Sequence, residues 1–178
     1  MALSVDELHA RARRVRLVLL DVDGVLTDSA VVITGAGPES KTFSVRDGAA
    51  LAWARDCGLD VGLLSGRSSD ATTRRATELG IDLVIQGGPK KREPFLQLIA
   101  ERGLAADEVA YMGDDLADLP VLTRVGLAAS PADAAPEVLS RAHWVSTCRG
   151  GRGAVRELIE LVLRARGQWD GLVARHLE

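Results

Sequence analysis

The sequence predicts an α/β protein with a doubly wound, Rossmann-like parallel sheet, and two observations support this class. First, VRLVLL at residues 15–20 is almost wholly apolar, which is typical of a strand that is buried on both faces of a parallel sheet. Second, similar runs recur at 60–64, 81–86 and 108–112, and stretches of helical composition separate them. Such alternation folds into right-handed crossovers that place helices on both faces of one sheet.

The helices expected between these strands cover residues 47–57, 68–79 and 92–102. Most of them stop before a glycine, the residue that is favoured just beyond a helix C-terminus. A further short helix is expected at the start of the chain, because Ser4 and Glu7 have the spacing of a capping box. Each of the three inner helices therefore leads back to another strand.

One segment interrupts the alternation of strands and helices. Residues 28–45 contain two β-prone stretches around GAGPES, whose glycine and proline favour a turn, so we expect a β-hairpin flap beside the site. The chain has 178 residues, 47% of them hydrophobic, which fits a single domain that spans residues 1–178. Residues 150–178 are expected to form a C-terminal helix followed, after Gly167, by a polar tail.

Composition narrows the classes of function. The 22 basic and 25 acidic residues give a formal net charge of −3, and no strongly basic block suggests a nucleic-acid partner. Cys57 and Cys148 form no CxxC pair, which is typical of free thiols in a reducing compartment. The sequence has no signal-peptide core and no apolar run long enough to span a membrane. We therefore expect a cytoplasmic protein that binds neither nucleic acid nor membrane.

Polar side chains follow the predicted strands where the carboxyl ends of a parallel sheet meet. Asp21 and Asp23 follow the first strand, Ser65 the second and Lys91 the third. The fourth strand is followed by an acidic cluster of Asp114, Asp115 and Asp118. Taken singly, each has an ordinary alternative, since an aspartate after a strand is a common turn residue and Lys91 has basic neighbours typical of a solvated surface. Their convergence on one sheet edge favours a catalytic site.

The segments that contain these residues resemble the four ordered motifs of the haloacid dehalogenase superfamily. They are DVDGVLTD at 21–28, SGR at 65–67, Lys91, and GDDLAD at 113–118. The resemblance implies a magnesium-dependent phosphatase in which Asp21 is the nucleophile and Asp23 is the general acid and base. It implies that Ser65 and Lys91 bind the phosphate. The implied Mg²⁺ ligands are Asp21, the Asp23 carbonyl and Asp114, while Asp115 and Asp118 bind the metal, directly or through water, or orient Lys91.

Narrower signals resemble the 3-deoxy-D-manno-octulosonate 8-phosphate phosphatases, which act on an eight-carbon sugar acid in lipopolysaccharide synthesis. These signals are the absence of a large cap insertion and the segments FSVRDG at 43–48, QGGPKKREPF at 86–95 and GGRGAVREL at 150–158. The resemblance implies a homotetramer in which flap hairpins pack together and the segment around Arg152 reaches a neighbour's site. It also implies a pocket for a small phosphorylated sugar acid, lined by Ser44, Val45, Arg46, Asp47, Gly48, Gly66, Arg67, Arg75 and Arg152.

Three alternatives stay open at this point. A nonulosonate 9-phosphate phosphatase would share the fold, the motifs and the missing cap, and Ala52 stands where the octulosonate phosphatases often carry an arginine. A non-catalytic tetramerisation module is disfavoured because every motif residue is present. A phosphomutase is disfavoured because it normally needs a cap to retain its intermediate. For GGRGAVREL, a glycine-marked start of an amphipathic core helix is a simpler interpretation that does not exclude the functional one.

Overall fold

The computed structural model describes residues 3–33, 35, 37, 39–88 and 90–177. Within them, the chain forms one six-stranded sheet with the order β3-β2-β1-β4-β5-β6. The strands are β1 (Leu17–Leu20), β2 (Asp60–Ser65), β3 (Leu83–Gln86), β4 (Val109–Met112), β5 (Leu127–Ser130) and β6 (Trp144–Val145). Every pairing between neighbouring strands is parallel. The predicted fold class, a doubly wound α/β sheet, is thereby confirmed.

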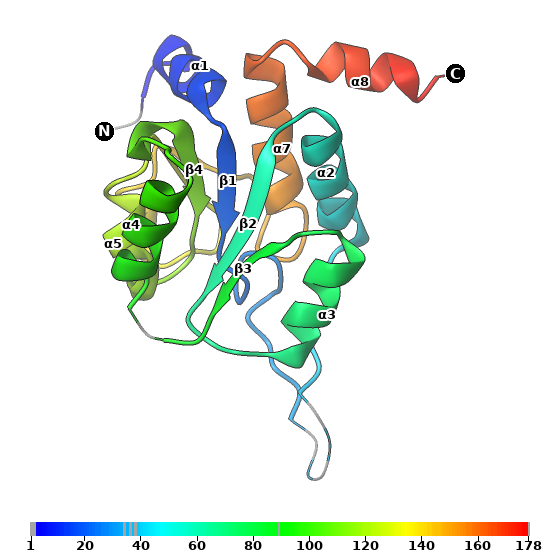
Figure 1. Cartoon of the computed structure of the whole chain (residues 1–178), viewed down its shortest axis with the longest axis vertical. Coiled ribbons are helices and arrows are strands. Elements are labelled where there is room, and N and C mark those ends of the chain that lie inside the picture. The colour runs from blue at the N-terminus through cyan, green and yellow to red at the C-terminus, as the bar shows by residue number, and fades with distance from the viewer. Residues whose placement is uncertain (1–2, 34, 36, 38, 89, 178) are drawn as a thin grey trace.

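Helices cover both faces of this sheet (Figure 1). The α-helices are α1 (Val5–Arg14), α2 (Val45–Asp56), α3 (Asp70–Glu78), α4 (Arg92–Glu101), α5 (Leu119–Leu122), α6 (Pro136–Leu139), α7 (Ala154–Ala165) and α8 (Trp169–Arg175), with short 3₁₀ turns η1 (Ala106–Glu108) and η2 (Leu116–Asp118). Helices α1, α2, α3 and α7 contribute to the hydrophobic cluster on one face, and α4, α5 and α6 to the cluster on the other. None of the described helices is long and apolar enough to cross a membrane.

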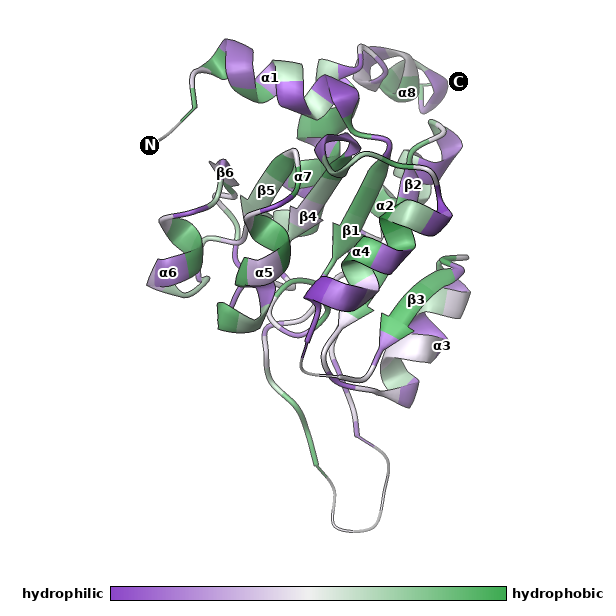
Figure 2. Cartoon of the chain, turned by 60° about the vertical axis from the view of Figure 1, so that its left-hand side comes forward, coloured by the Kyte–Doolittle hydropathy of each residue, from purple (hydrophilic) through white to green (hydrophobic). Residues whose placement is uncertain are grey.

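Strand β1 is apolar along its whole length (Figure 2). Its side chains alternate between the two faces: Leu20 packs in the cluster that contains Leu158 of α7, and Leu19 in the cluster that contains Phe95 of α4. All four residues of the strand are fully buried. The apolar run therefore reflects burial on both faces, as predicted.

The expected helix ends agree well with the structure. The Ser4 hydroxyl accepts a hydrogen bond from the Glu7 amide at 3.2 Å, and the Glu7 carboxylate accepts one from the Ser4 amide at 3.1 Å, which completes the predicted capping box. The glycines that follow α2, α3 and α4 all have a left-handed φ, and they are Gly58, Gly80 and Gly103. A left-handed residue ends a helix with little strain only when it lacks a Cβ.

The flap at 28–45 contains less β-structure than expected. Val32 and Ser40 form a single antiparallel bridge in which each backbone amide donates to the other residue's carbonyl, at 3.2 and 3.1 Å. Val45 begins α2 instead of ending a strand, because the Ser44 hydroxyl caps that helix by accepting from the Asp47 amide at 3.3 Å. Three positions of the expected hairpin, 34, 36 and 38, lie outside the described residues. In Figure 1 the flap extends from the end of the molecule opposite to α1 and α8.

The structure also differs from the expected polar tail after Gly167. That segment continues into α8, whose Leu172 is buried against the core. Trp169 of α8 packs edge to face on Trp53 of α2, with ring centroids 6.1 Å apart, a favourable geometry for aromatic pairs. The tail is therefore docked on the helical layer formed by α2 and α7.

Candidate active site

A pocket of about 220 Å³ lies at the carboxyl edge of β1, β2 and β4. Its lining includes every residue that the sequence analysis named as catalytic or metal-binding, together with Gly66 and Arg67. The register explains this convergence: β1 is paired with β4 so that Leu20 lies beside Met112, and the Asp21 amide donates to the Met112 carbonyl at 3.0 Å. Residues that directly follow these two strands must therefore be neighbours.

Lys91 lies at the centre of the buried charges. Its Nζ is 2.9 Å from Asp21 Oδ2 and 2.6 Å from Asp118 Oδ1, and its side chain is only 3% exposed. Burial alone would lower the pKa of Lys91, but the charges of Asp21 and Asp118 offset this effect and leave the pKa above its usual value. The lysine therefore stays an ammonium ion that can bind an anion at the pocket floor.

The carboxylates around Lys91 carry more negative charge than one lysine can balance. Oxygen atoms of Asp21, Asp114 and Asp118 all lie within 4.8 Å of one another. Burial, followed by the charge of Asp118, raises the pKa of Asp21 to about 6 although Lys91 opposes the shift. Burial and the charges of Asp118 and Asp21 raise the pKa of Asp114 to about 7. Such an oxygen-rich cluster fits a hard divalent cation, whose charge would relieve the repulsion.

Asp118 differs from the other two carboxylates because donors already surround it. Its Oδ1 accepts from Lys91 and from the Tyr111 hydroxyl, at 2.6 and 2.5 Å. Its Oδ2 accepts from the backbone amides of Asp114 and Asp115, at 2.9 and 3.1 Å. Asp118 thus holds the loop after β4 and orients Lys91. Of the two roles that the sequence left open for Asp118, metal binding and orientation of Lys91, this geometry supports the second.

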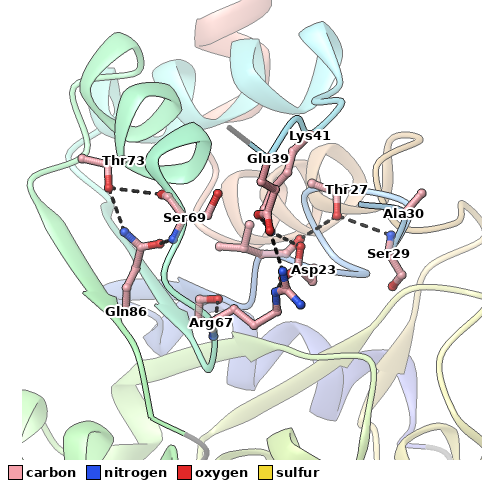
Figure 3. Close-up of polar contacts among 12 residues, drawn as sticks. Asp23, Thr27, Ser29, Ala30, Glu39, Lys41, Arg67, Ser69, Thr73 and Gln86 are labelled. Atoms are coloured by element: carbon pink, nitrogen blue, oxygen red, sulfur yellow. Dashed lines mark hydrogen bonds and ion pairs between the residues drawn. The ribbon is translucent and has the colours of Figure 1, made fainter. Parts of the chain in front are cut away.

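Asp23 lies at the rim of the pocket, within a network that the sequence analysis did not anticipate (Figure 3). The Lys41 ammonium contacts Asp23 Oδ1, and Arg67 Nε lies 3.5 Å from Asp23 Oδ2. Arg67 also donates from Nη2 to Glu39 Oε2 at 2.5 Å. Lys41 and Glu39 belong to the flap, and a polar residue in a flap normally indicates a solvated surface, so no pattern in the sequence singled them out.

Ser65 and Gly66 close the side of the pocket that β2 delivers. Ser65 is 4% exposed, and its hydroxyl accepts from the Arg67 amide at 3.3 Å. The Gly66 carbonyl accepts from the Gly88 amide at 3.1 Å, which ties this turn to the loop after β3. These contacts hold the Ser65 hydroxyl in the lining of the pocket that also includes Lys91.

Seven of the predicted substrate-binding residues do not line this pocket, and they are Ser44, Val45, Arg46, Asp47, Gly48, Arg75 and Arg152. Arg75 pairs with Glu78 at 2.9 Å, and its guanidinium fills the space where a Cβ on Gly48 would stand. Val45 and Arg46 are exposed in the first turn of α2. Arg152 Nη2 lies 3.2 Å from Asp28 Oδ2 of the same chain, and this Arg152 side chain is 66% exposed.

Asp47 is turned away from the pocket and has a structural partner. Its carboxylate accepts from the amides of Gly153 and Arg156, at 3.1 and 2.8 Å. Asp47 as a whole is 1% exposed. These amides belong to the first turn of α7, where backbone donors lack partners within the helix. The FSVRDG segment therefore caps the helix that GGRGAVREL begins.

The glycines of GGRG support the loop that carries the Asp21 and Asp23 carboxylates. The Gly151 amide donates to the Val25 carbonyl at 2.9 Å, and a Cβ on Gly150 would overlap the Gly24 carbonyl oxygen. Gly24 itself has φ +83° and would clash with Asp114 if it carried a Cβ. Glycine is therefore required at 150 for the close approach of the two backbones, and at 24 for the left-handed φ and the contact with Asp114.

The comparisons with known proteins agree with this geometry. A family model described as a haloacid dehalogenase-like hydrolase matches residues 39–126. The match identifies a haloacid dehalogenase-like hydrolase domain, and the phosphatases reported in the next two paragraphs define the class of protein as a phosphoric monoester hydrolase. The phosphatase assignment drawn from the four motifs is confirmed.

Relatives of known activity narrow the class further. The 3-deoxy-D-manno-octulosonate 8-phosphate phosphatase of Escherichia coli K12 is 42% identical over 164 residues, which cover 92% of this chain and 87% of that protein. The crystal structure of the Yersinia pestis phosphatase has a TM-score of 0.91 at 40% identity, covering 93% of this chain and 90% of that one. The chain belongs to this family of haloacid dehalogenase-like hydrolases, the 3-deoxy-D-manno-octulosonate 8-phosphate phosphatases and their homologues.

A third relative was solved with ligands. The Moraxella catarrhalis 3-deoxy-D-manno-octulosonate 8-phosphate phosphatase, in complex with a magnesium ion, a phosphate ion and a KDO molecule, is 34% identical. The match covers 97% of this chain and 99% of that one, with a TM-score of 0.95. The backbone that carries the site is therefore shared with a protein whose crystals hold the metal, the phosphate and the sugar acid.

We expect Gly150→Ala to lower both activity and stability. Its methyl group would force the loop with Asp21 and Asp23 away from the 150–153 segment, at a cost of about 1–3 kcal/mol. Steady-state kinetics and urea unfolding measure the two effects. The matched control is Gly171→Ala in α8, an exposed position where a Cβ meets nothing within 4 Å. Equal kcat and equal stability in the two variants would contradict the supporting role of the GGRG segment.

Proposed function

We propose that this chain hydrolyses 3-deoxy-D-manno-octulosonate 8-phosphate to the free sugar acid and phosphate, through a phosphoryl group carried on Asp21. The observation that carries the proposal is the buried Asp21 carboxylate at the pocket floor, 2.9 Å from the Lys91 ammonium. A carboxylate attacks phosphorus only when the negative charge of the phosphate is offset and the nucleophile is aimed at it. The relatives that act on this sugar phosphate support the choice of substrate.

The proposed reaction has two displacements. In the first, an Asp21 oxygen bonds to phosphorus, the bond from phosphorus to the sugar oxygen breaks, and the Asp23 carboxyl gives its proton to that oxygen. In the second, water attacks the phosphorus of the aspartyl-phosphate, and Asp23 takes the proton that the water loses. The bond between Asp21 and phosphorus then breaks, which releases inorganic phosphate and restores both carboxyl groups.

Ser65 and Lys91 hold the phosphate during both steps. The Ser65 hydroxyl donates to one phosphate oxygen and the Lys91 ammonium to another, because both line the pocket on the β2 and β3 side. Asp118 keeps Lys91 in place by accepting from it at 2.6 Å. Charge-assisted hydrogen bonds of this kind are stronger than neutral ones.

The acidic cluster is proposed to bind Mg²⁺ through Asp21, Asp114 and the backbone carbonyl of Asp23. Asp115, whose Oδ1 already accepts from the Leu116 amide at 2.7 Å, would act through water, and Asp118 would act on Lys91. When bound, Mg²⁺ supplies positive charge that offsets the phosphate and the cluster. The raised pKa values of Asp21 and Asp114 support this assignment, because burial and mutual repulsion without a metal are what raise them.

We also propose that the 178 residues form one domain, that the protein works in the cytoplasm, and that it assembles as a homotetramer through the flap. Val32 and Ile33 of the flap are 57% and 83% exposed, and apolar side chains on a projecting segment favour packing against another surface. Both cysteines are free thiols, as is typical of a reducing compartment.

The substrate is tested by a phosphate-release assay on three esters. We expect kcat/KM to be highest for 3-deoxy-D-manno-octulosonate 8-phosphate and lower for a nonulosonate 9-phosphate and p-nitrophenyl phosphate. Asp21→Asn should release no phosphate from any of them, because the amide is a poor nucleophile of the same shape. The control is Asp56→Asn at an exposed position of α2. A folded Asp21→Asn protein with near-wild-type turnover would refute the assignment of the nucleophile. A higher kcat/KM for the nonulosonate 9-phosphate would refute the proposed substrate and favour that ester instead.

Removal of the metal should abolish activity, and added Mg²⁺ should restore it better than Ca²⁺, which prefers a larger coordination shell. Mg²⁺ should also raise the midpoint of thermal unfolding, since it binds the folded state. Asp114→Asn should be more stable than the wild type without metal, because it removes repulsion from Asp118 and Asp21, and it should lose the Mg²⁺-induced rise. Full activity after exhaustive chelation would exclude a metal-dependent mechanism.

A further inference from the structure

Four side chains form a closed ring of alternating charges at the rim of the pocket (Figure 3). The Lys41 ammonium contacts Asp23 Oδ1 and lies 3.4 Å from Glu39 Oε1. Arg67 closes the ring, with Nη2 2.5 Å from Glu39 Oε2 and Nε 3.5 Å from Asp23 Oδ2. Two members of the ring come from the flap, and the other two from the loops that follow β1 and β2.

Lys41 is the member of the ring with the least access to water. Its side chain is 0% exposed, whereas that of Arg67 is 55% exposed. A buried ammonium is costly unless carboxylates surround it. The Lys41 ammonium therefore depends on Asp23 and Glu39, and its removal would leave Arg67 as the one cation of the ring to balance two carboxylates.

The backbone of the flap explains why Glu39 and Lys41 both reach the ring. Ser40 lies between Glu39 and Lys41 and is held by two backbone hydrogen bonds to Val32. Alternate residues of an extended segment project to the same side. The single bridge of the flap therefore aims Glu39 and Lys41 together toward Asp23 and Arg67, while the Ser40 residue stays exposed.

The orientation of the Asp23 carboxylate depends on this ring. Asp23 Oδ2 and Glu39 Oε1 are buried and have no hydrogen-bond partner among the described residues. Buried oxygens of this kind normally find a donor, so the ionic contacts with Lys41 and Arg67 are what restrain them. A carboxyl group that transfers a proton must be held at a fixed distance and angle from the oxygen that receives it.

We propose that Lys41 is a positioning residue that holds the Asp23 carboxyl group in place for proton transfer. Glu39 in turn holds the Arg67 guanidinium in place. The inference rests on the proposed role of Asp23 as general acid. It makes the flap of each chain a part of that chain's own active site. The consequence depends on the leaving group: a sugar alkoxide needs a proton as it departs, whereas p-nitrophenolate leaves readily without one.

The test compares leaving groups in Lys41→Met, which removes the charge and keeps the length of the side chain. We expect kcat for the sugar phosphate to fall about tenfold more than kcat for p-nitrophenyl phosphate, within the range that general acid catalysis contributes. Across a series of aryl phosphates, log kcat should fall more steeply with the pKa of the leaving alcohol. Lys41→Arg keeps the charge and should keep the wild-type slope. Lys90→Met, at an exposed lysine, is the matched control.

A purely structural role for Lys41 would lower kcat equally for all esters, and this result would overturn the proposal. An unchanged slope in Lys41→Met would overturn it too. If that variant does not fold, as judged by circular dichroism, Lys41→Gln is measured in the same series. Asp23→Asn distinguishes the role of Asp23 as general acid from the role of Lys41 as its positioning residue. A normal slope in Asp23→Asn would refute Asp23 as the acid, whereas a steep slope there with a normal slope in Lys41→Met would refute only the role of Lys41.

Discussion

The contact of one buried ammonium with two carboxylates is the interaction on which the site depends. Lys91 lies between Asp21 after β1 and Asp118 after β4, and each ion alone would pay a desolvation penalty of several kcal/mol. The parallel register of β1 and β4 brings the two carboxylates to the same edge, and the turn after β3 brings the lysine. Lys91 is thereby held at the pocket floor as an ammonium ion that can bind a phosphate oxygen.

The same crowding explains why the protein needs a second cation. Lys91 balances one of the nearby carboxylates, and the pKa values of Asp21 and Asp114 rise because the remaining negative charge is not balanced. At the rim, by contrast, Lys41 and Arg67 balance Asp23 and Glu39 one for one. The floor of the pocket is thus suited to a metal and a phosphate, and the rim is suited to hold one carboxyl group in a fixed orientation.

Much of the fold and of the chemistry could be predicted from the sequence, because the signals were local. Apolar runs indicated β1 to β4, glycines marked three helix ends, and polar residues after the strands converged on one pocket. Features that depend on contacts between distant parts of the chain could not be predicted from local patterns. Asp47 caps α7 across more than a hundred residues of chain, and the burial of Lys41 follows only from the position of the flap. The short strands β5 and β6 and the docked helix α8 likewise give little periodicity of their own.

The central claim is that the phosphoryl group is carried by Asp21 between two displacements, and the stereochemistry at phosphorus tests it most directly. A sugar phosphorothioate made chiral with two oxygen isotopes would be hydrolysed in water that carries the third isotope, and the configuration of the released thiophosphate would be determined. Two in-line displacements each invert the phosphorus, so the account predicts net retention of configuration. Net inversion would show a single direct attack by water and would contradict the proposed role of Asp21.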